Sequence, residues 1–122
     1  MAGVGRGITR LAEEERLSGA TVAGGLVFLA GQVADDATLD AEGQTADILS
    51  QVDALLAQAG TDKRALVQVQ VVLADIKDAP AMNRAWDAWL DRANPPARAT
   101  VQARLANPAW RVEITGIAAL PA

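Results

Sequence analysis

The sequence predicts an α+β fold, in which a mixed β-sheet carries two helices on one face in the order β-β-β-α-β-α-β-β. The chain has 122 residues, 51% of them hydrophobic, which suffices for one core. Two segments carry apolar residues at helical spacing, and the other apolar runs are short and favour strands. We therefore expect residues 1–122 to form a single domain, with the glycine-rich residues 1–7 as a flexible lead-in.

Three strands are expected before the first helix, over residues 8–11, 19–23 and 26–33. Gly24 and Gly25 separate the second strand from the third, and such a pair favours a tight hairpin because both residues adopt positive φ without strain. The third run is apolar at consecutive positions, which is typical of a central strand that is covered on both faces.

The first helix is expected between Asp40, a suitable N-cap residue, and Gly60, a suitable residue just past the C-terminus. Apolar or small side chains recur along it at the spacing of one buried stripe. The stripe consists of Thr45, Ile48, Leu49, Val52, Leu55, Leu56 and Ala59.

The second helix is expected to follow Asp78 as its N-cap residue and to carry Pro80 in its first turn. We expect it to end at residues 94–96, where Asn94 precedes two prolines. Its buried face consists of Met82, Ala85, Trp86, Trp89 and Leu90.

Three further strands complete the sheet, over residues 65–74, 98–105 and 110–118, with a turn at residues 107–108 between the last two. Because two helices cover only one face of such a sheet, we expect the other face to be a subunit contact. An oligomer also suits a chain with a core this small.

The composition excludes several classes of chemistry. Without Cys, His or Tyr, the chain has no thiolate nucleophile, no Ser-His-Asp triad and no cysteine or histidine to bind zinc. Its net charge of −4 disfavours nucleic-acid binding, which needs cations to neutralise phosphates. Because there is neither a membrane-spanning apolar run nor an export signal, we expect a cytoplasmic protein without nucleic-acid or membrane partners.

Two charged residues near the C-terminus are candidates for chemistry. Arg98 follows a stiff Pro95-Pro96-Ala97 segment, and Glu113 is flanked by valine and isoleucine in the middle of the last strand. One interpretation is structural: a strand-end charge and a sheet-face charge, in contact as an ion pair. The other is an anion site, in which the guanidinium group of Arg98 binds a carboxylate and Glu113 handles a water molecule. Alternation along the strands does not separate the two.

The segment from Pro95 to Val101, followed by Glu113 between Val112 and Ile114, resembles the signature of the RidA/YjgF family. Ala30-Gly31-Gln32 matches the third-strand segment of that family. Residues 44–46 and 83–89 resemble its YoaB-like branch. The resemblance covers residues 8–119 and implies a chorismate-mutase-like fold, a homotrimer and a ligand cleft at each subunit interface.

The resemblance also implies an activity, the hydrolytic deamination of small reactive 2-imino or 2-enamino acids to 2-keto acids and ammonia, without a cofactor or metal. In that pattern Arg98 holds the substrate carboxylate, Glu113 positions or activates the water, and the Thr100 backbone contacts the imine. Gly31 lets the chain pass close to the ligand. The alternative is a trimeric module that binds carboxylate metabolites without turning them over.

The chain departs from the archetypal deaminases at two positions of the expected pocket. Leu17 stands where they have a tyrosine, and Ala30 where they have a serine, so the pocket is expected to be more apolar. Trp89 and Phe28 are candidates for a hydrophobic wall against a bulkier substrate. For Trp89, as for Trp86, the alternative is plain core packing at helical spacing.

Overall fold

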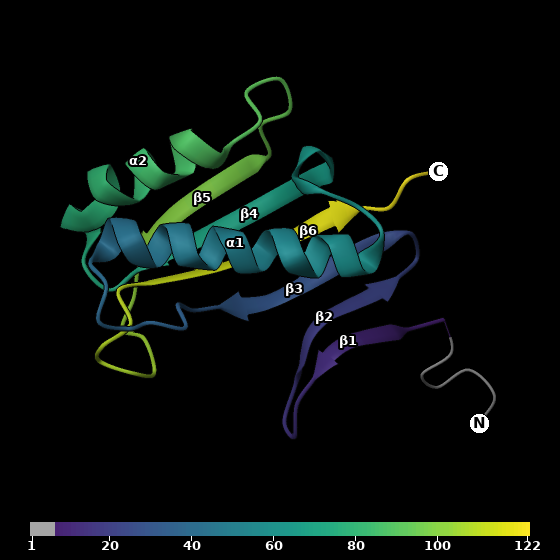
Figure 1. Ribbon diagram of the computed structural model, residues 1–122, viewed down its shortest axis with the longest axis horizontal. Helices are drawn as coiled ribbons and strands as arrows, with labels where there is room; N and C mark the ends of the chain where they lie inside the picture. Colours follow the sequence, from purple (N-terminus) through teal and green to yellow (C-terminus); the bar gives the residue numbers. More distant parts are fainter. Residues whose placement is uncertain (1–6) are drawn as a thin grey trace.

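The computed structural model describes residues 7–122 as one six-stranded sheet with two helices (Figure 1). The elements are β1 (Thr9–Glu13), β2 (Ser18–Ala23), β3 (Leu26–Gln32), α1 (Ala41–Ala59), β4 (Leu66–Leu73), α2 (Ala79–Trp89), β5 (Ala97–Gln102) and β6 (Val112–Ala119), with short 3₁₀ turns at Lys63–Ala65 and Ile76–Asp78. This order is the predicted one. Apart from Gly7, the expected lead-in lies outside the described residues.

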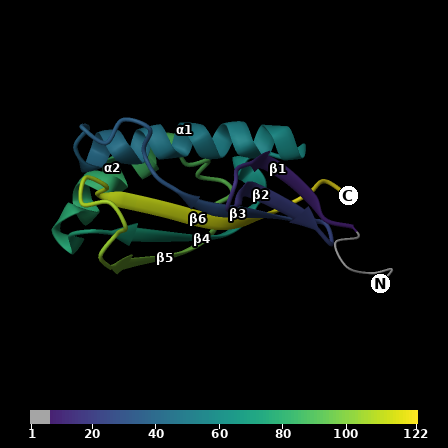
Figure 2. The ribbon, with the colours of Figure 1, turned by 90° about the horizontal axis from the view of Figure 1, so that it is seen from below.

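The strands are arranged in the order β1-β2-β3-β6-β4-β5. β4 and β5 are parallel, and every other neighbouring pair is antiparallel. Both helices lie on the same face of the sheet (Figure 2), so the predicted mixed sheet with two helices on one face is confirmed. No helix within residues 7–122 is long and apolar enough to cross a membrane.

The turn and cap residues behave as their types predict. Gly24 and Gly25 adopt φ of +59° and +77° in the β2–β3 hairpin. Asp40 caps α1, its carboxylate accepting a hydrogen bond from the Gly43 N–H at 2.8 Å. Gly60 ends the helix with φ +88°. These local signals fix α1 against the sheet, where its buried stripe forms most of the helical side of the core.

The second helix differs from the expectation at both ends. Asp78 occupies the N-cap position, but its side chain makes no capping hydrogen bond. α2 ends at Trp89 rather than at Asn94, because Leu90 is extended, with ψ 136°. The carboxylate of Asp91 then accepts from the Ala93 N–H at 3.0 Å, and this local turn competes with continued helix.

The last predicted strands are shorter than expected. β5 ends at Gln102 because its neighbour β4 ends at Leu73 and leaves the sheet. The Gln102 side chain instead accepts a hydrogen bond from the Ile76 N–H at 2.8 Å. The predicted turn at residues 107–108 is present, with the Asn107 carbonyl accepting from the Trp110 N–H at 3.0 Å.

No part of residues 7–122 covers the face of the sheet opposite the helices (Figure 2). β3 was expected to be covered on both faces, but Val27 and Leu29 are buried while Phe28, which points the other way, is 39% exposed. Val101 on β5 is exposed to the same degree. The face also carries a hollow of about 340 Å³ beside Phe28 and Ala99. The apolar run of β3 therefore faces the core on one side and an open surface on the other.

Candidate functional site

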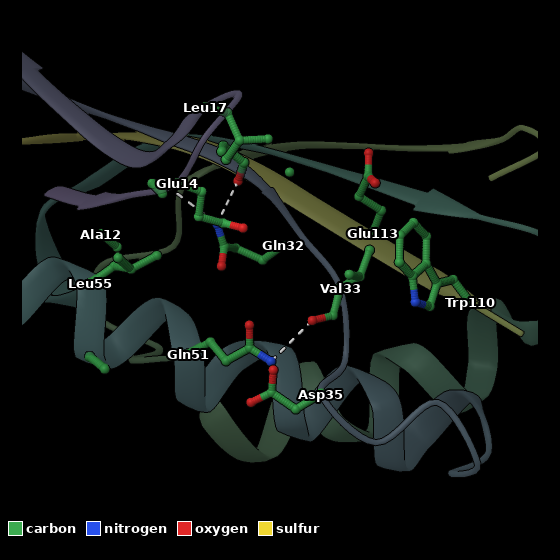
Figure 3. A pocket seen from close by; sticks show the side chains of 14 residues that line it. Ala12, Glu14, Leu17, Gln32, Val33, Asp35, Gln51, Leu55, Trp110 and Glu113 are labelled. Atoms are coloured by element: carbon green, nitrogen blue, oxygen red, sulfur yellow. Dashed lines mark hydrogen bonds between the residues drawn. The ribbon is translucent and has the colours of Figure 1, made fainter. Parts of the chain in front are cut away.

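A cavity of about 650 Å³ lies between the β1–β2 connection, the end of β3, α1 and the start of β6 (Figure 3). Its lining residues are Ala12, Glu14, Leu17, Gly19, Ala30, Gly31, Gln32, Val33, Asp35, Gln51, Ala54, Leu55, Trp110 and Glu113. Four of the residues that the sequence singles out are among them, and they come from three different parts of the chain.

Glu113 reaches the cavity because of its place on β6. Its neighbours Val112 and Ile114 are buried in the core, so the alternation of the strand turns Glu113 to the opposite side. The side chain is half-buried. In Figure 3 it lies beside Trp110 on the β6 side of the cavity, whereas Gln51 and Asp35 lie on the side of α1.

Gly31 lies directly against Glu113. The pairing of β3 with β6 shifts register between Leu29 and Gln32, which places an irregular stretch of backbone over the carboxylate. A Cβ atom on Gly31 would lie 2.8 Å from Oε2 of Glu113 and 2.9 Å from its carboxyl carbon, closer than van der Waals contact allows. Glycine is therefore needed at this position for the side chain of Glu113 to lie where it does.

Side-chain amides hold the backbone around the cavity. Gln51 on α1 donates from Nε2 to the Val33 carbonyl at 3.0 Å, and Gln32 donates to the Ala30 carbonyl at 3.0 Å. Gln32 is part of the Ala30-Gly31-Gln32 segment that resembles the family, whereas Gln51 was not among the expected site residues. For Gln51 a signal was present, because it lies between Ile48 and Leu55 on the inward side of a helix whose neighbouring positions are apolar.

The cavity is acidic. Its charged lining residues within the described chain are Glu14, Asp35 and Glu113, and no arginine or lysine lines it. The rest of the lining is mostly apolar. A bound carboxylate would need a cation from elsewhere to offset these charges.

Arg98 is not in this cavity. Its guanidinium carbon lies 5.1 Å from the centre of the Trp86 ring, and its Nη1 is 3.8 Å from Sδ of Met82. Both partners belong to α2, so Arg98 points to the helical side of the sheet. Glu113 points to the other side, and β4 lies between β5 and β6. One chain therefore does not bring the two residues together, and the ion pair considered for them is not formed within residues 7–122.

The other expected ligand contacts lie in two places. Leu17 and Ala30 line the cavity. Thr100 lies near Arg98 on β5, and its buried hydroxyl has no hydrogen-bond partner within residues 7–122. Trp89 lies elsewhere: its indole N–H donates to Asp53 at 2.9 Å, and its ring is 5.5 Å from that of Trp86.

The aromatic wall of the cavity is Trp110, which the sequence analysis placed only at the start of a strand. Phe28, which was expected to form this wall together with Trp89, lies instead on the uncovered face of the sheet. No periodicity distinguishes Trp110, because it lies before β6 begins.

Comparison with known proteins relates the chain to a family. A family model described as endoribonuclease L-PSP matches residues 7–120. The chain is 44% identical to a RutC family protein of Haemophilus ducreyi, over 93% of this chain and 97% of that protein. It is 40% identical to the RutC family protein YoaB of Escherichia coli, over 93% and 98%.

A crystal structure gives the same result for the fold. NMB1025 of Neisseria meningitidis, a member of the YjgF protein family, superposes with a TM-score of 0.91 at 43% sequence identity. The match covers 94% of this chain and 96% of that one. The resemblance and the fold class inferred from sequence are thereby confirmed, and the protein belongs to the RidA/YjgF/RutC family, with its similarity to YoaB placing it in the YoaB-like branch.

Proposed function

We propose that this protein hydrolyses reactive 2-imino and 2-enamino acids to 2-keto acids and ammonia. The observation that carries the proposal is the half-buried carboxylate of Glu113, which lies in a cavity against a backbone position without a side chain. The missing side chain at Gly31 leaves room for the carboxyl group of Glu113 itself, and this places the carboxylate in the cavity where a ligand can approach it. The family membership supports the same activity.

The reaction suits a site with one carboxylate and no histidine. A 2-imino acid is already electrophilic at carbon, so the water needs mainly to be positioned. Glu113 takes a proton from the attacking water as the C–O bond forms, and it returns a proton to the nitrogen of the tetrahedral intermediate. Glu113 then takes the proton of the new hydroxyl group and passes it to the amino nitrogen, so that the C=O bond forms as the C–N bond breaks, and ammonia and a 2-keto acid leave. No redox change takes place.

The substrate carboxylate requires a cation, and we propose that Arg98 of a second copy supplies it. Within one chain Arg98 lies on the opposite face from Glu113, with β4 in between. Strands are spaced by about 4.8 Å, so β5 and β6 are about 10 Å apart across β4. A neighbouring subunit can present the arginine to the mouth of the cavity without this obstacle.

The proposed contact between copies consists of the uncovered face of the sheet together with the β5 edge, from which Arg98 is presented. It carries the exposed Phe28 and Val101. The surface that presents Arg98 differs from the surface that carries the cavity. Each copy therefore contacts the next one head-to-tail, and a closed series of such contacts forms a ring. We propose a homotrimer, as the resemblance implies, with three equivalent sites and a cytoplasmic location.

A second candidate function is a non-catalytic trimeric module that binds carboxylate metabolites. The observation that favours it is the presence of Leu17 and Ala30 in the cavity. Neither side chain has a hydroxyl group to hold the substrate nitrogen or the water. In this alternative Arg98 anchors a keto acid and no bond is broken.

We do not extend the proposal to ribonuclease activity. The net charge of −4 and the acidic lining of the cavity both repel a phosphate backbone. RNA binding that weakens steeply with added salt would contradict this expectation.

The test generates an imine in situ with an amino-acid oxidase and measures keto acid and ammonia with and without the protein. Arg98→Ala should lower kcat/KM at least 100-fold, because a desolvated charge contact contributes about 3 kcal/mol. Glu113→Gln should lower kcat by about 100-fold or more. Arg64→Ala is the matched control, since that exposed arginine pairs with Asp62 away from the cavity, and it should leave turnover unchanged.

Size-exclusion chromatography of each variant separates lost chemistry from lost assembly. Wild-type turnover in Arg98→Ala with the oligomer intact would overturn the proposed role of Arg98. Binding of 2-keto acids without ammonia release, even by the wild-type protein, would instead favour the non-catalytic module.

A further inference from the structure

The Glu113 cavity is larger, and its wall more apolar, than a three-carbon substrate needs. Trp110, Leu17 and Leu55 line it, and its volume of about 650 Å³ lies within the range of pockets that enclose drug-sized ligands. The half-buried indole of Trp110 is the largest side chain in this lining.

Trp110 also lines a second hollow of about 650 Å³, which lies under the β5–β6 connection. The same side chain therefore lies between two spaces, and it limits how far a ligand beside Glu113 can extend in that direction. A side chain at this position controls the length and shape of the space next to the reacting carboxylate.

The charges of the cavity disfavour substrates with an acidic side chain. Its charged lining residues within residues 7–122 are Glu14, Asp35 and Glu113. The one cation in the proposed site, Arg98 of the neighbouring copy, is taken up by the substrate's own carboxylate. A substrate with an acidic side chain would place a further carboxylate among three others without a cation.

We infer that the site is selective for 2-imino acids with bulky, apolar side chains, such as those derived from leucine and phenylalanine, and that Trp110 is the specificity-determining residue. This inference rests on the proposed function and adds to it the substrate class. The apolar wall binds the side chain, while the acidic lining rejects dicarboxylic imino acids.

The first experiment measures kcat/KM for imines generated by amino-acid oxidases from alanine, leucine, phenylalanine and glutamate. Semicarbazide competes with the protein for the free imine. A slower formation of the semicarbazone therefore reports the rate at which the protein releases the keto acid. The leucine and phenylalanine imines should react at least tenfold more efficiently than the alanine imine, since each buried methylene adds several-fold to binding. The glutamate imine should react most slowly. An equal or higher kcat/KM for the alanine or glutamate imine would overturn the inference.

The second experiment changes the wall. Trp110→Ala should lower the ratio of kcat/KM between the phenylalanine and alanine imines by about tenfold, mainly through KM. Trp110→Phe keeps an aromatic surface and should retain most of the ratio. Trp89→Phe is the matched control, because Trp89 lies outside the cavity, and its ratio should equal that of the wild type. An unchanged ratio in Trp110→Ala would overturn the role of Trp110.

A binding series separates this inference from the proposed reaction. Dissociation constants for pyruvate, 4-methyl-2-oxopentanoate, phenylpyruvate and 2-oxoglutarate are measured by calorimetry. Tighter binding of the two bulky apolar keto acids, even without imine turnover, supports the side-chain selectivity while the deaminase proposal fails. Binding that is equal across the series overturns the selectivity while any observed turnover still stands.

Discussion

The contact between Gly31 and Glu113 predicts the effect of a single added methyl group. In Gly31→Ala the new Cβ would lie 2.8 Å from Oε2 of Glu113, whereas unstrained contacts begin near about 3.5 Å. The carboxyl group must therefore retreat by about 0.7 Å. Since Gly31 does not have a positive φ, alanine fits its backbone conformation and the flexible end of the glutamate takes up the strain.

Gly31→Ala should affect the stability of the protein much less than its activity. The free energy of unfolding should fall by less than about 1 kcal/mol, as for a surface change whose neighbour can move. A displacement approaching 1 Å at a reacting group lowers rates by up to about 100-fold, so kcat/KM for imine hydrolysis should fall by about 10-fold to 100-fold. Calorimetric melting measures the first quantity, and keto-acid release measures the second.

A double-mutant cycle tests whether the loss acts through Glu113. In a Glu113→Gln background, Gly31→Ala should lower the remaining activity by less than about threefold, because the positioned carboxylate is already absent. If Gly31→Ala keeps wild-type kcat/KM, or causes the same loss in both backgrounds, the proposed relation between the two residues is refuted.

Three further predictions concern assembly, capping and titration. If each site takes Arg98 from one subunit and Glu113 from the next, randomly mixed trimers of Arg98→Ala and Glu113→Gln should recover about a quarter of the sites; activity of the mixture no higher than that of the separate variants would show that the residues are not shared in this way. Asp40→Ala should lower the melting temperature and reduce the free energy of unfolding by about 1 kcal/mol, because it removes the hydrogen bond to the first turn of α1. The kcat/KM for imine hydrolysis should not change. Arg64 donates a hydrogen bond to Asp62 and lowers the pKa of that carboxyl from 3.8 to about 2, so the contribution of the pair is present above pH 3.8 and is lost as the pH falls through 2. In Arg64→Ala the Asp62 pKa, followed by NMR, should return towards 3.8, and an unchanged pKa would contradict this cause.

Much of the fold follows from local signals. The glycines at 24 and 25, Asp40 and Gly60 each act as their backbone preferences predict, because turns and helix ends depend on few neighbouring residues. Local signals did not predict the end of α2, because the backbone becomes extended at Leu90, before the prolines. Local signals did not predict the strand order either, since the placement of β6 between β3 and β4 depends on packing between distant segments.

The candidate site was only partly predictable. The residues that gather around one cavity as expected are Leu17, Ala30, Gly31 and Glu113. A period of two tells which residues share a side of a strand, but not which face of the sheet that side meets. Arg98 and Glu113, which one interpretation made an ion pair, lie on opposite faces of the sheet. Trp110 carried no periodic signal, because it precedes its strand.

The position of Arg98 over the ring of Trp86 has a practical consequence. The protein has three tryptophans and no tyrosine, so its ultraviolet emission comes from indole alone. A cation 5.1 Å from the Trp86 ring perturbs that chromophore electrostatically, and any anion that draws the guanidinium away alters its fluorescence. If Arg98 holds the substrate carboxylate as proposed, the native chain carries its own unlabelled reporter of ligand binding.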